Sequence, residues 1–93
     1  MAHAVVANVN LEGRDFEQVE RILREQVVPG VKQAPGFQSG VWLRMPDGNT
    51  GMGVIVFDSE ANAKAAEQAM PNLRPADAPP MTSITVCEVS AQA

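Results

Sequence analysis

Four residues of this sequence have side chains and spacings suited to holding a small planar molecule: Asn8, Trp42, Arg44 and Phe57. Trp42 is the only tryptophan, and Arg44 follows it by two positions, so both side chains share one face of a strand. An indole beside a guanidinium can stack on a planar ligand and anchor it. Asn8 interrupts an apolar run, where asparagine is unfavourable in a strand, so its amide is a candidate to bind a carbonyl or oxyanion.

We therefore predict Asn8, Trp42, Arg44 and Phe57 as substrate-binding residues, with Asn8 as the candidate catalytic residue. Each also has a purely structural interpretation, which the sequence leaves open. Asn8 could hydrogen-bond a neighbouring loop, and Trp42 could pack in the core or at an interface while Arg44 reaches solvent. Phe57 is expected first as a core residue, and only secondarily as part of a pocket wall.

The other reactive residues predict little chemistry. His3, the only histidine, stands at the N-terminus, where we expect a surface role rather than general-base catalysis. Cys87, the only cysteine, excludes an intrachain disulfide and a thiolate zinc site, and we expect it to be an inert buried thiol. Metal-ligand spacing is absent, and the glycines from Gly48 to Gly53 fall around a hairpin rather than between a strand and a helix. No cofactor or metal is therefore expected.

Length and charge restrict the other possibilities. With 93 residues there is room for one domain, spanning 1–93. Eleven acidic and seven scattered basic residues give a net charge of −4, which argues against a nucleic acid or an anionic membrane as partner. The N-terminal residues lack the charged region of a signal peptide, and no run is long enough to span a membrane. We therefore expect a cytoplasmic protein.

The hydrophobic pattern predicts the elements that position these residues. They are a strand at 4–11, an amphipathic helix at about 16–27 that is kinked or interrupted at Pro29-Gly30 with a further turn at 31–33, strands at 37–45 and 52–57, a helix from a cap at Asp58 or Ser59 to about Met70, a loop at 71–80, and a strand at about 82–89. Pro71 is expected to end the second helix, whose inward face is predicted at Ala61, Ala65, Ala66 and Ala69. This order, βαββαβ, predicts an α+β, ferredoxin-like domain with a four-stranded antiparallel sheet.

Both faces of this sheet are expected to be apolar. One alternating set contains Val5, Ala7, Val9, Val41, Leu43, Met52, Val54 and Val56, and the other contains Val6, Trp42, Ile55, Phe57, Ile84 and Val86. Because two helices cover only one face of such a sheet, the second face needs another partner. Self-association with twofold symmetry is the simplest solution, so we predict a homodimer through the sheet face. Cover by the loop at 71–80 is the alternative.

At this point the chain resembles the dimeric α+β barrel proteins, and within them the antibiotic biosynthesis monooxygenase family. The resemblance spans nearly the whole chain. It rests on the element order, on residues 34–40 (APGFQSG), which lead into the second strand, and on residues 54–60 (VIVFDSE), which lead into the second helix. Members of this family include cofactor-free oxygenases acting on quinol-like polyketides, haem-degrading enzymes and proteins without a known role. The resemblance implies a pocket between the helices and the sheet.

The haem-degrading branch is similar in having an asparagine on the first strand, a tryptophan on the third and a histidine on the second helix. Asn8 matches the first in kind, but the third strand ends in Phe57 and the second helix has no histidine, so an axial haem ligand is absent. Two functions remain open. One is a homodimeric monooxygenase that oxidises a quinol-like aromatic substrate without a cofactor; the other is a non-catalytic dimer that binds a small apolar or aromatic molecule or serves a structural role.

Overall fold

The computed structural model describes residues 1–93 apart from the side chain of Leu73. Four strands, β1 (His3–Asn10), β2 (Phe37–Arg44), β3 (Thr50–Phe57) and β4 (Met81–Glu88), form one sheet in the order β2-β3-β1-β4. Every neighbouring pair is antiparallel. Together with the helices this is the βαββαβ, ferredoxin-like α+β fold that the sequence predicted.

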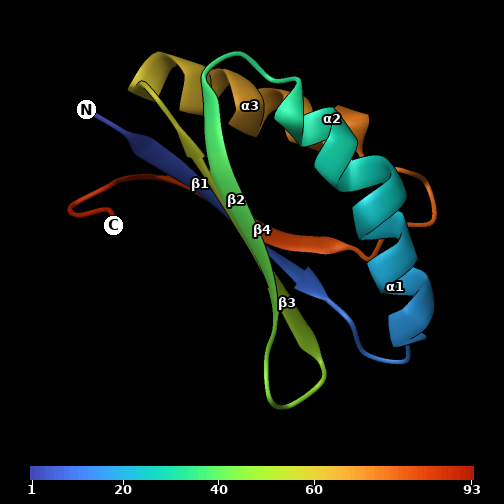
Figure 1. The fold of residues 1–93 in the computed structure, drawn as a ribbon. Helices are drawn as coiled ribbons and strands as arrows, with labels where there is room; N and C mark the ends of the chain where they lie inside the picture. Colours follow the sequence, from blue (N-terminus) through green and yellow to red (C-terminus); the bar gives the residue numbers. More distant parts are fainter.

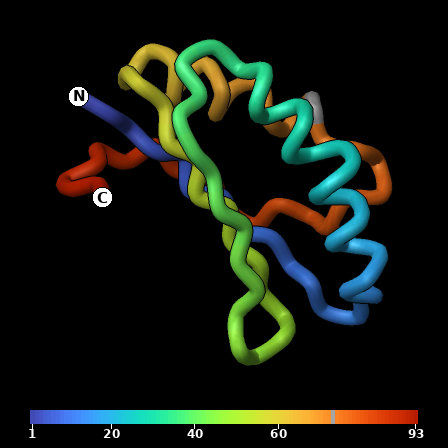
Figure 2. Tube along the Cα trace, viewed as in Figure 1, coloured from blue at the N-terminus to red at the C-terminus, as the bar shows by residue number. Residues whose placement is uncertain are grey.

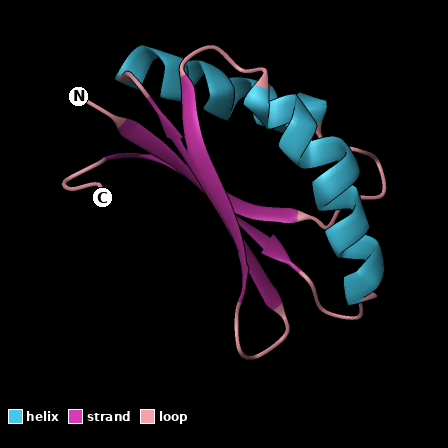
Figure 3. Ribbon diagram, viewed as in Figure 1, coloured by secondary structure: helices cyan, strands magenta, loops and turns pink.

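All the helices lie on one side of the sheet (Figure 1; Figure 3). They are α1 (Phe16–Ile22), the π-helical segment η1 (Leu23–Val27), α2 (Val28–Lys32) and α3 (Glu60–Leu73). The two ends of the chain lie at the same end of the molecule (Figure 2), where the Val89 amide donates to the Ala2 carbonyl at 3.0 Å. No helix in the described part of the chain is both long and apolar enough to cross a membrane.

The first three helical segments follow one another without a break and form a single curved cover, which we call the cover helix (residues 16–32). Asp15 caps its start by accepting a hydrogen bond from the Glu17 amide at 3.0 Å. The cover helix is irregular at η1, where a wide π-helical turn forms and the Val28 amide donates to the Leu23 carbonyl five residues earlier. Pro29 follows directly and has no N–H to donate to Glu25. The predicted interruption is therefore a π-helical turn just before Pro29 rather than a break.

The second helix differs from the prediction at its end and in its inward face. Ser59 caps α3, but the helix continues through Pro71 to Leu73, because a proline in the last turn removes only one intrahelical hydrogen bond. Ala63 is completely buried, and Ala66 and Met70 pack on the same core, whereas Ala61 and Ala65 are exposed. The inward face is therefore rotated from the predicted one, with Ala63, Ala66 and Met70 at the spacing of one helical stripe.

The core lies between α3 and the middle of the sheet. Val5 and Phe57 are fully buried, and Ile55 and Ala63 complete the buried cluster. Phe37 meets Phe57 edge-on, with ring centroids 6.5 Å apart. Phe57 is therefore a core residue, as the sequence first suggested, and not an exposed side chain.

The residues that share each face of the sheet differ from the two predicted sets. Val5 pairs with Ile55 and with Val86. Val5 and the alternate residues of β1 therefore lie on the same face of the sheet as Trp42 and Ile55. The other face, which we call the open face, contains Val6, Val41, Leu43, Met52, Val54 and Val56. The predicted alternation of side chains within each strand was correct. The prediction of which β1 residues share a face with which residues of β2 and β3 was wrong, because this depends on the pairing register between strands.

The open face carries no helix and no long loop. Val41 and Leu43 expose 49% and 44% of their surface, which is high for such apolar side chains. The loop between α3 and β4 does not reach this face, because its residues Pro75, Ala78 and Pro79 line the space on the helix side. The alternative in which this loop covers the second face is therefore wrong.

The complete burial of Phe57 leads to a prediction about stability. Phe57→Ala should lower the free energy of unfolding by about 3–5 kcal/mol, since it removes a large side chain and leaves a void. Phe16→Ala is the matched control, and because Phe16 is 37% exposed it should cost about 1 kcal/mol or less. Urea denaturation of the three proteins measures both values, and equal losses would contradict this assignment of the core.

Candidate functional site: a cavity between the cover helix and the sheet

A cavity of about 860 Å³ separates the cover helix from the sheet. Its volume lies in the range that holds a drug-sized molecule. The helical wall is mostly apolar, and it includes Val19, Ile22, Leu23, Val27 and Val31 beside the polar Glu20 and Gln26. Ala66, Ala69 and Met70 of α3 close one side, and Pro75, Ala78 and Pro79 of the following loop also line it.

The cavity exists because the sheet residues beneath the cover helix are small. Ala7 of β1 and Gly51 and Gly53 of β3 are buried floor residues. A side chain on Gly51 would have no space, since its Cβ would lie 2.9 Å from Cγ2 of Val9. While α3 packs directly on β1, β3 and β4, the cover helix faces the sheet across this unfilled space.

Trp42 lies across the floor of the cavity. It pairs with Gly53 on β3, and a Cβ on Gly53 would lie 3.0 Å from the indole Nε1. A Cβ on Gly40 would lie 2.9 Å from the indole Cη2. The ring therefore occupies the room that two glycines leave, and it is half-buried among the residues that line the cavity.

Arg44 and Phe16 lie together at one end of the cavity, and both are exposed. The guanidinium carbon of Arg44 sits 4.2 Å from the centroid of the Phe16 ring, which is a cation–π contact. This contact joins the end of β2 to the first turn of the cover helix. Arg44 is thus held against an aromatic ring while its charge stays in contact with water.

Arg74 was not among the predicted site residues, yet it lines the cavity from the C-terminal end of α3. Its Nη2 is buried, and among the described residues it has no hydrogen-bond partner. A buried donor without a partner costs about 1–3 kcal/mol, so such a group calls for an explanation. Nothing in the sequence distinguished Arg74 from the other scattered cations, because only the fold brings it to the cavity.

Of the four predicted site residues, the structure brings three to one place. Trp42, Arg44 and Phe57 line the cavity, and Asn8 does not. Asn8 pairs with Met52 whereas Trp42 pairs with Gly53, so their side chains leave opposite faces of the sheet. The predicted combination of Asn8 with the other three in one site does not hold.

Asn8 instead links two strands on the open face. Its side-chain Nδ2 donates to Oγ of Ser83 on β4 at 2.9 Å, and its backbone carbonyl accepts from Oγ1 of Thr82 at 3.2 Å. A register shift in the β1–β4 pairing falls directly after Asn8. The structural interpretation of Asn8, a hydrogen bond to a neighbouring segment, is the one that these contacts fit, with a strand in place of a loop.

The remaining reactive residues lie outside the cavity. Nε2 of His3 is 3.6 Å from Oε2 of Glu60 at the start of α3, with the imidazole 14% exposed. Cys87 is exposed on β4, so the expectation of a buried thiol was wrong, because Cys87 pairs with Ala4 on the open face, which no helix covers. The described residues contain no group of His, Cys, Asp and Glu that could hold a metal ion.

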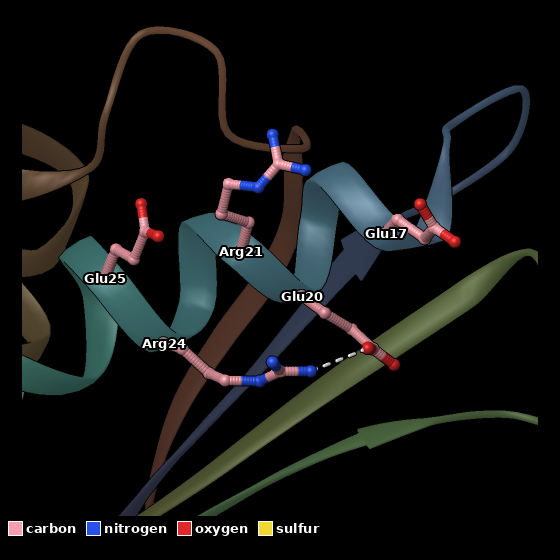
Figure 4. Close-up of a pocket in the computed structure, with 5 residues that line it drawn as sticks. All are labelled: Glu17, Glu20, Arg21, Arg24 and Glu25. Carbon is pink, nitrogen blue, oxygen red and sulfur yellow. Dashed lines mark hydrogen bonds and ion pairs between the residues drawn. The ribbon is translucent and has the colours of Figure 1, made fainter.

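A second depression, of about 480 Å³, lies on the solvent side of the cover helix (Figure 4). Its five lining residues are all charged: Glu17, Glu20, Arg21, Arg24 and Glu25. Nη2 of Arg24 is 2.9 Å from Oε2 of Glu20, one turn earlier, an ordinary exposed pair. We interpret this depression as the solvated face of an amphipathic helix and not as a binding site.

Solved structures of the same shape exist. The haem-degrading protein MhuD from Mycobacterium tuberculosis, solved with two haems in its active site, is 19% identical, with a TM-score of 0.69 over 100% of this chain and 99% of that chain. An ethyl tert-butyl ether (EthD) family protein from Bacillus halodurans is 16% identical, with a TM-score of 0.62 over 96% of this chain and 99% of that one. Both proteins share the α+β fold described above.

A third similar structure is a monooxygenase from the gene ActVA-Orf6 of Streptomyces coelicolor, in complex with nanaomycin D. It is 13% identical, with a TM-score of 0.59 over 99% of this chain and 92% of that chain. Neither a family model nor a curated protein sequence matches the chain. At these identities the similarities confirm the predicted resemblance in fold and leave the activity to be argued from the cavity.

The residues of this cavity do not fit haem. The chain has one histidine and one cysteine, and neither His3 nor Cys87 belongs to the cavity lining. A histidine or thiolate is therefore not available there as an axial ligand for iron.

The contact between Trp42 and Gly53 gives a direct prediction. Gly53→Ala should push the indole toward the cavity and destabilise the protein by about 1–3 kcal/mol, as overpacking does. Because Trp42 is the only tryptophan, a shift of the emission maximum reports the displacement. Gly30→Ala, whose Cβ would meet nothing within 4 Å, should leave the emission unchanged; identical spectra for all three proteins would contradict the placement of Trp42.

Proposed function

We propose that this protein binds a small, largely apolar aromatic molecule in the cavity between the cover helix and the sheet. The observation that carries the proposal is the volume of about 860 Å³, enclosed mostly by aliphatic side chains with few polar groups. Trp42 offers a flat aromatic surface on the floor for a planar ligand. Arg44, held against Phe16, supplies a cation at one end for an oxygen substituent.

We further propose that the ligand is a quinol-like substrate and that the reaction is its oxidation by O₂ without a cofactor. In such a monooxygenation a ring carbon that is a CH₂ group in the keto tautomer of the quinol becomes C=O, with one oxygen atom coming from O₂. The other oxygen atom leaves as water with the two hydrogens, and the substrate itself supplies the electrons. The fold similarity to a monooxygenase solved with nanaomycin D supports this reaction class.

The side chains of the cavity would act on the substrate by binding and by excluding water. An arginine close to a phenolic oxygen favours the phenolate, which is the form that gives up electrons readily. Tyrosine is absent from the sequence, and the cavity lining contains no histidine or cysteine. Ionisation of the substrate would therefore depend on its own acidity and on the nearby cation rather than on a dedicated base.

Non-catalytic binding of an aromatic molecule is the second candidate function. Two observations favour it: the only carboxylate of the lining, Glu20, is paired with Arg24, and Asn8, the predicted catalytic residue, lies on the open face. Both functions use the same cavity, so a binding measurement tests what they share and a turnover measurement separates them. We propose a cytoplasmic location for either activity.

Calorimetric titration with 1,4-naphthohydroquinone under argon should show saturable binding, since the ligand can stack on Trp42. Trp42→Ala should weaken it by about tenfold through loss of the aromatic contact. Lys64→Ala, on the exposed side of α3, is the control and should bind like the parent. Absence of binding at millimolar ligand would contradict the proposed site.

The same hydroquinone in air separates enzyme from binding protein. Oxygen uptake should exceed autoxidation in proportion to protein concentration, and Trp42→Ala should lower it. Binding without any protein-dependent uptake would reject the monooxygenase and leave the non-catalytic function. An electrode measurement with heat-denatured protein as blank is sufficient.

We propose that the open face is the contact between two copies of the chain. It is apolar, exposed and uncovered, with Val41 and Leu43 exposed by 49% and 44%. Burying several hundred Å² of such surface contributes at roughly 25 cal/mol per Å², which is significant for a chain this small. A twofold axis relating two copies would bury the same open-face patch on each of them.

Light scattering after size-exclusion chromatography should therefore report about twice the chain mass of 9.9 kDa. Leu43→Arg, which puts a charge into the patch, should shift the protein to monomer while circular dichroism keeps its α+β spectrum. Lys32→Glu on the cover helix also changes a charge at an exposed position and should leave the dimer intact. A monomeric parent protein at micromolar concentration would contradict the assignment.

A further inference from the structure

We infer that the ligand of the cavity is an aromatic carboxylate, and that Arg74 binds its carboxylate group. This rests on the proposed function in so far as it concerns the same cavity, and it adds the charge of the ligand and the residue that recognises it. The proposed function requires only an apolar aromatic molecule, so the two statements can fail separately.

The first observation is the state of the Arg74 guanidinium. It lines the cavity, and its Nη2 is buried without a hydrogen-bond partner among the described residues. The ion pairs among the described residues involve the cations His3, Arg24 and Lys64, and none of these pairs includes Arg74. A carboxylate that enters the cavity would therefore gain hydrogen bonds from Arg74 without breaking an ion pair already present.

The second observation is the balance of charge around the cavity. Its lining contains three charged residues, Glu20, Arg44 and Arg74. Glu20 is paired with Arg24 at 2.9 Å, and Arg44 is exposed and stacked on Phe16. Arg74, half-buried beside apolar side chains, is screened less by water and salt than Arg44, so an anionic ligand interacts with it more strongly.

The third observation is the backbone around Arg74. Pro75 disfavours a helical conformation at the preceding residue, and Arg74 is accordingly extended, with ψ at 138°, where α3 ends. Pro75 and the buried Pro79 belong to the cavity lining, so the segment that carries Arg74 is restricted by two prolines. A planar guanidinium on a restricted backbone suits a planar carboxylate, which can accept two parallel hydrogen bonds.

The experiment compares two ligands of equal shape, 2-naphthoate and its neutral carboxamide, by titration calorimetry at low salt. The carboxylate should bind at least about tenfold more tightly, as expected for charge-assisted hydrogen bonds. Arg74→Gln should remove this preference and leave carboxamide affinity within about twofold of the parent. Arg21→Gln makes the same change of charge on the solvent side of the cover helix and should keep the preference.

Each outcome decides a separate point. Equal affinity of the parent protein for the two ligands would overturn the inference and leave the proposed site intact, whereas binding of neither ligand would overturn both. A preference for the carboxylate that survives in Arg74→Gln and disappears in Arg44→Gln would show that Arg44 binds the carboxylate, and it would also overturn the inference. If Arg74→Gln fails to fold, Arg74→Lys keeps the charge but loses the planar fork, and it should retain only part of the preference.

Discussion

The whole structure depends on one constraint, the alternation of side chains across a four-stranded sheet that has helices on one side only. Every second residue of each strand must meet the helices, and every residue between must meet something else. In this chain both sets are apolar. On the helix side the result is a core with a cavity beside it, and on the open face it is an exposed patch that includes Val41 and Leu43.

The core and the cavity share the same side of the sheet but have opposite side-chain sizes. Under α3, Phe57 and Ile55 pack with Ala63 of that helix in the buried core cluster. Under the cover helix, Gly51 and Gly53 leave it empty, and only Trp42 extends across the floor. One part of the helix side is thus filled by the core, and the part beside it is left open as a cavity of the size that holds small molecules.

Much of this could be predicted from the sequence, since it depends on local patterns. Alternating and helical periodicities gave the element order, the antiparallel sheet and its two apolar faces. Register was not accessible, because the pairing of Asn8 with Met52 and of Trp42 with Gly53 is fixed by contacts between distant segments. A difference of one position was enough to put Asn8 on the face opposite Trp42.

Arg74 and Pro71 show a second limit. A proline normally ends a helix, but in the last turn its cost is one hydrogen bond, and packing of Ala63, Ala66 and Met70 outweighs it. The extension of α3 carries Arg74 to the cavity, where no motif could have placed it. The sequence therefore predicted the scaffold and three residues that line the cavity, Trp42, Arg44 and Phe57, and it missed Arg74, which only the tertiary structure brings there.

The measurement that tests the central claim most directly is the position of a bound aromatic molecule relative to the two faces of the sheet. Nuclear Overhauser effects between unlabelled 2-naphthol and the isotopically labelled protein provide it. The account predicts contacts from the ligand to the indole of Trp42 and to the methyl groups of Ala7 and Ala66, all of which belong to the cavity lining. Contacts confined to the methyl groups of Val41 and Val54 on the open face would contradict it.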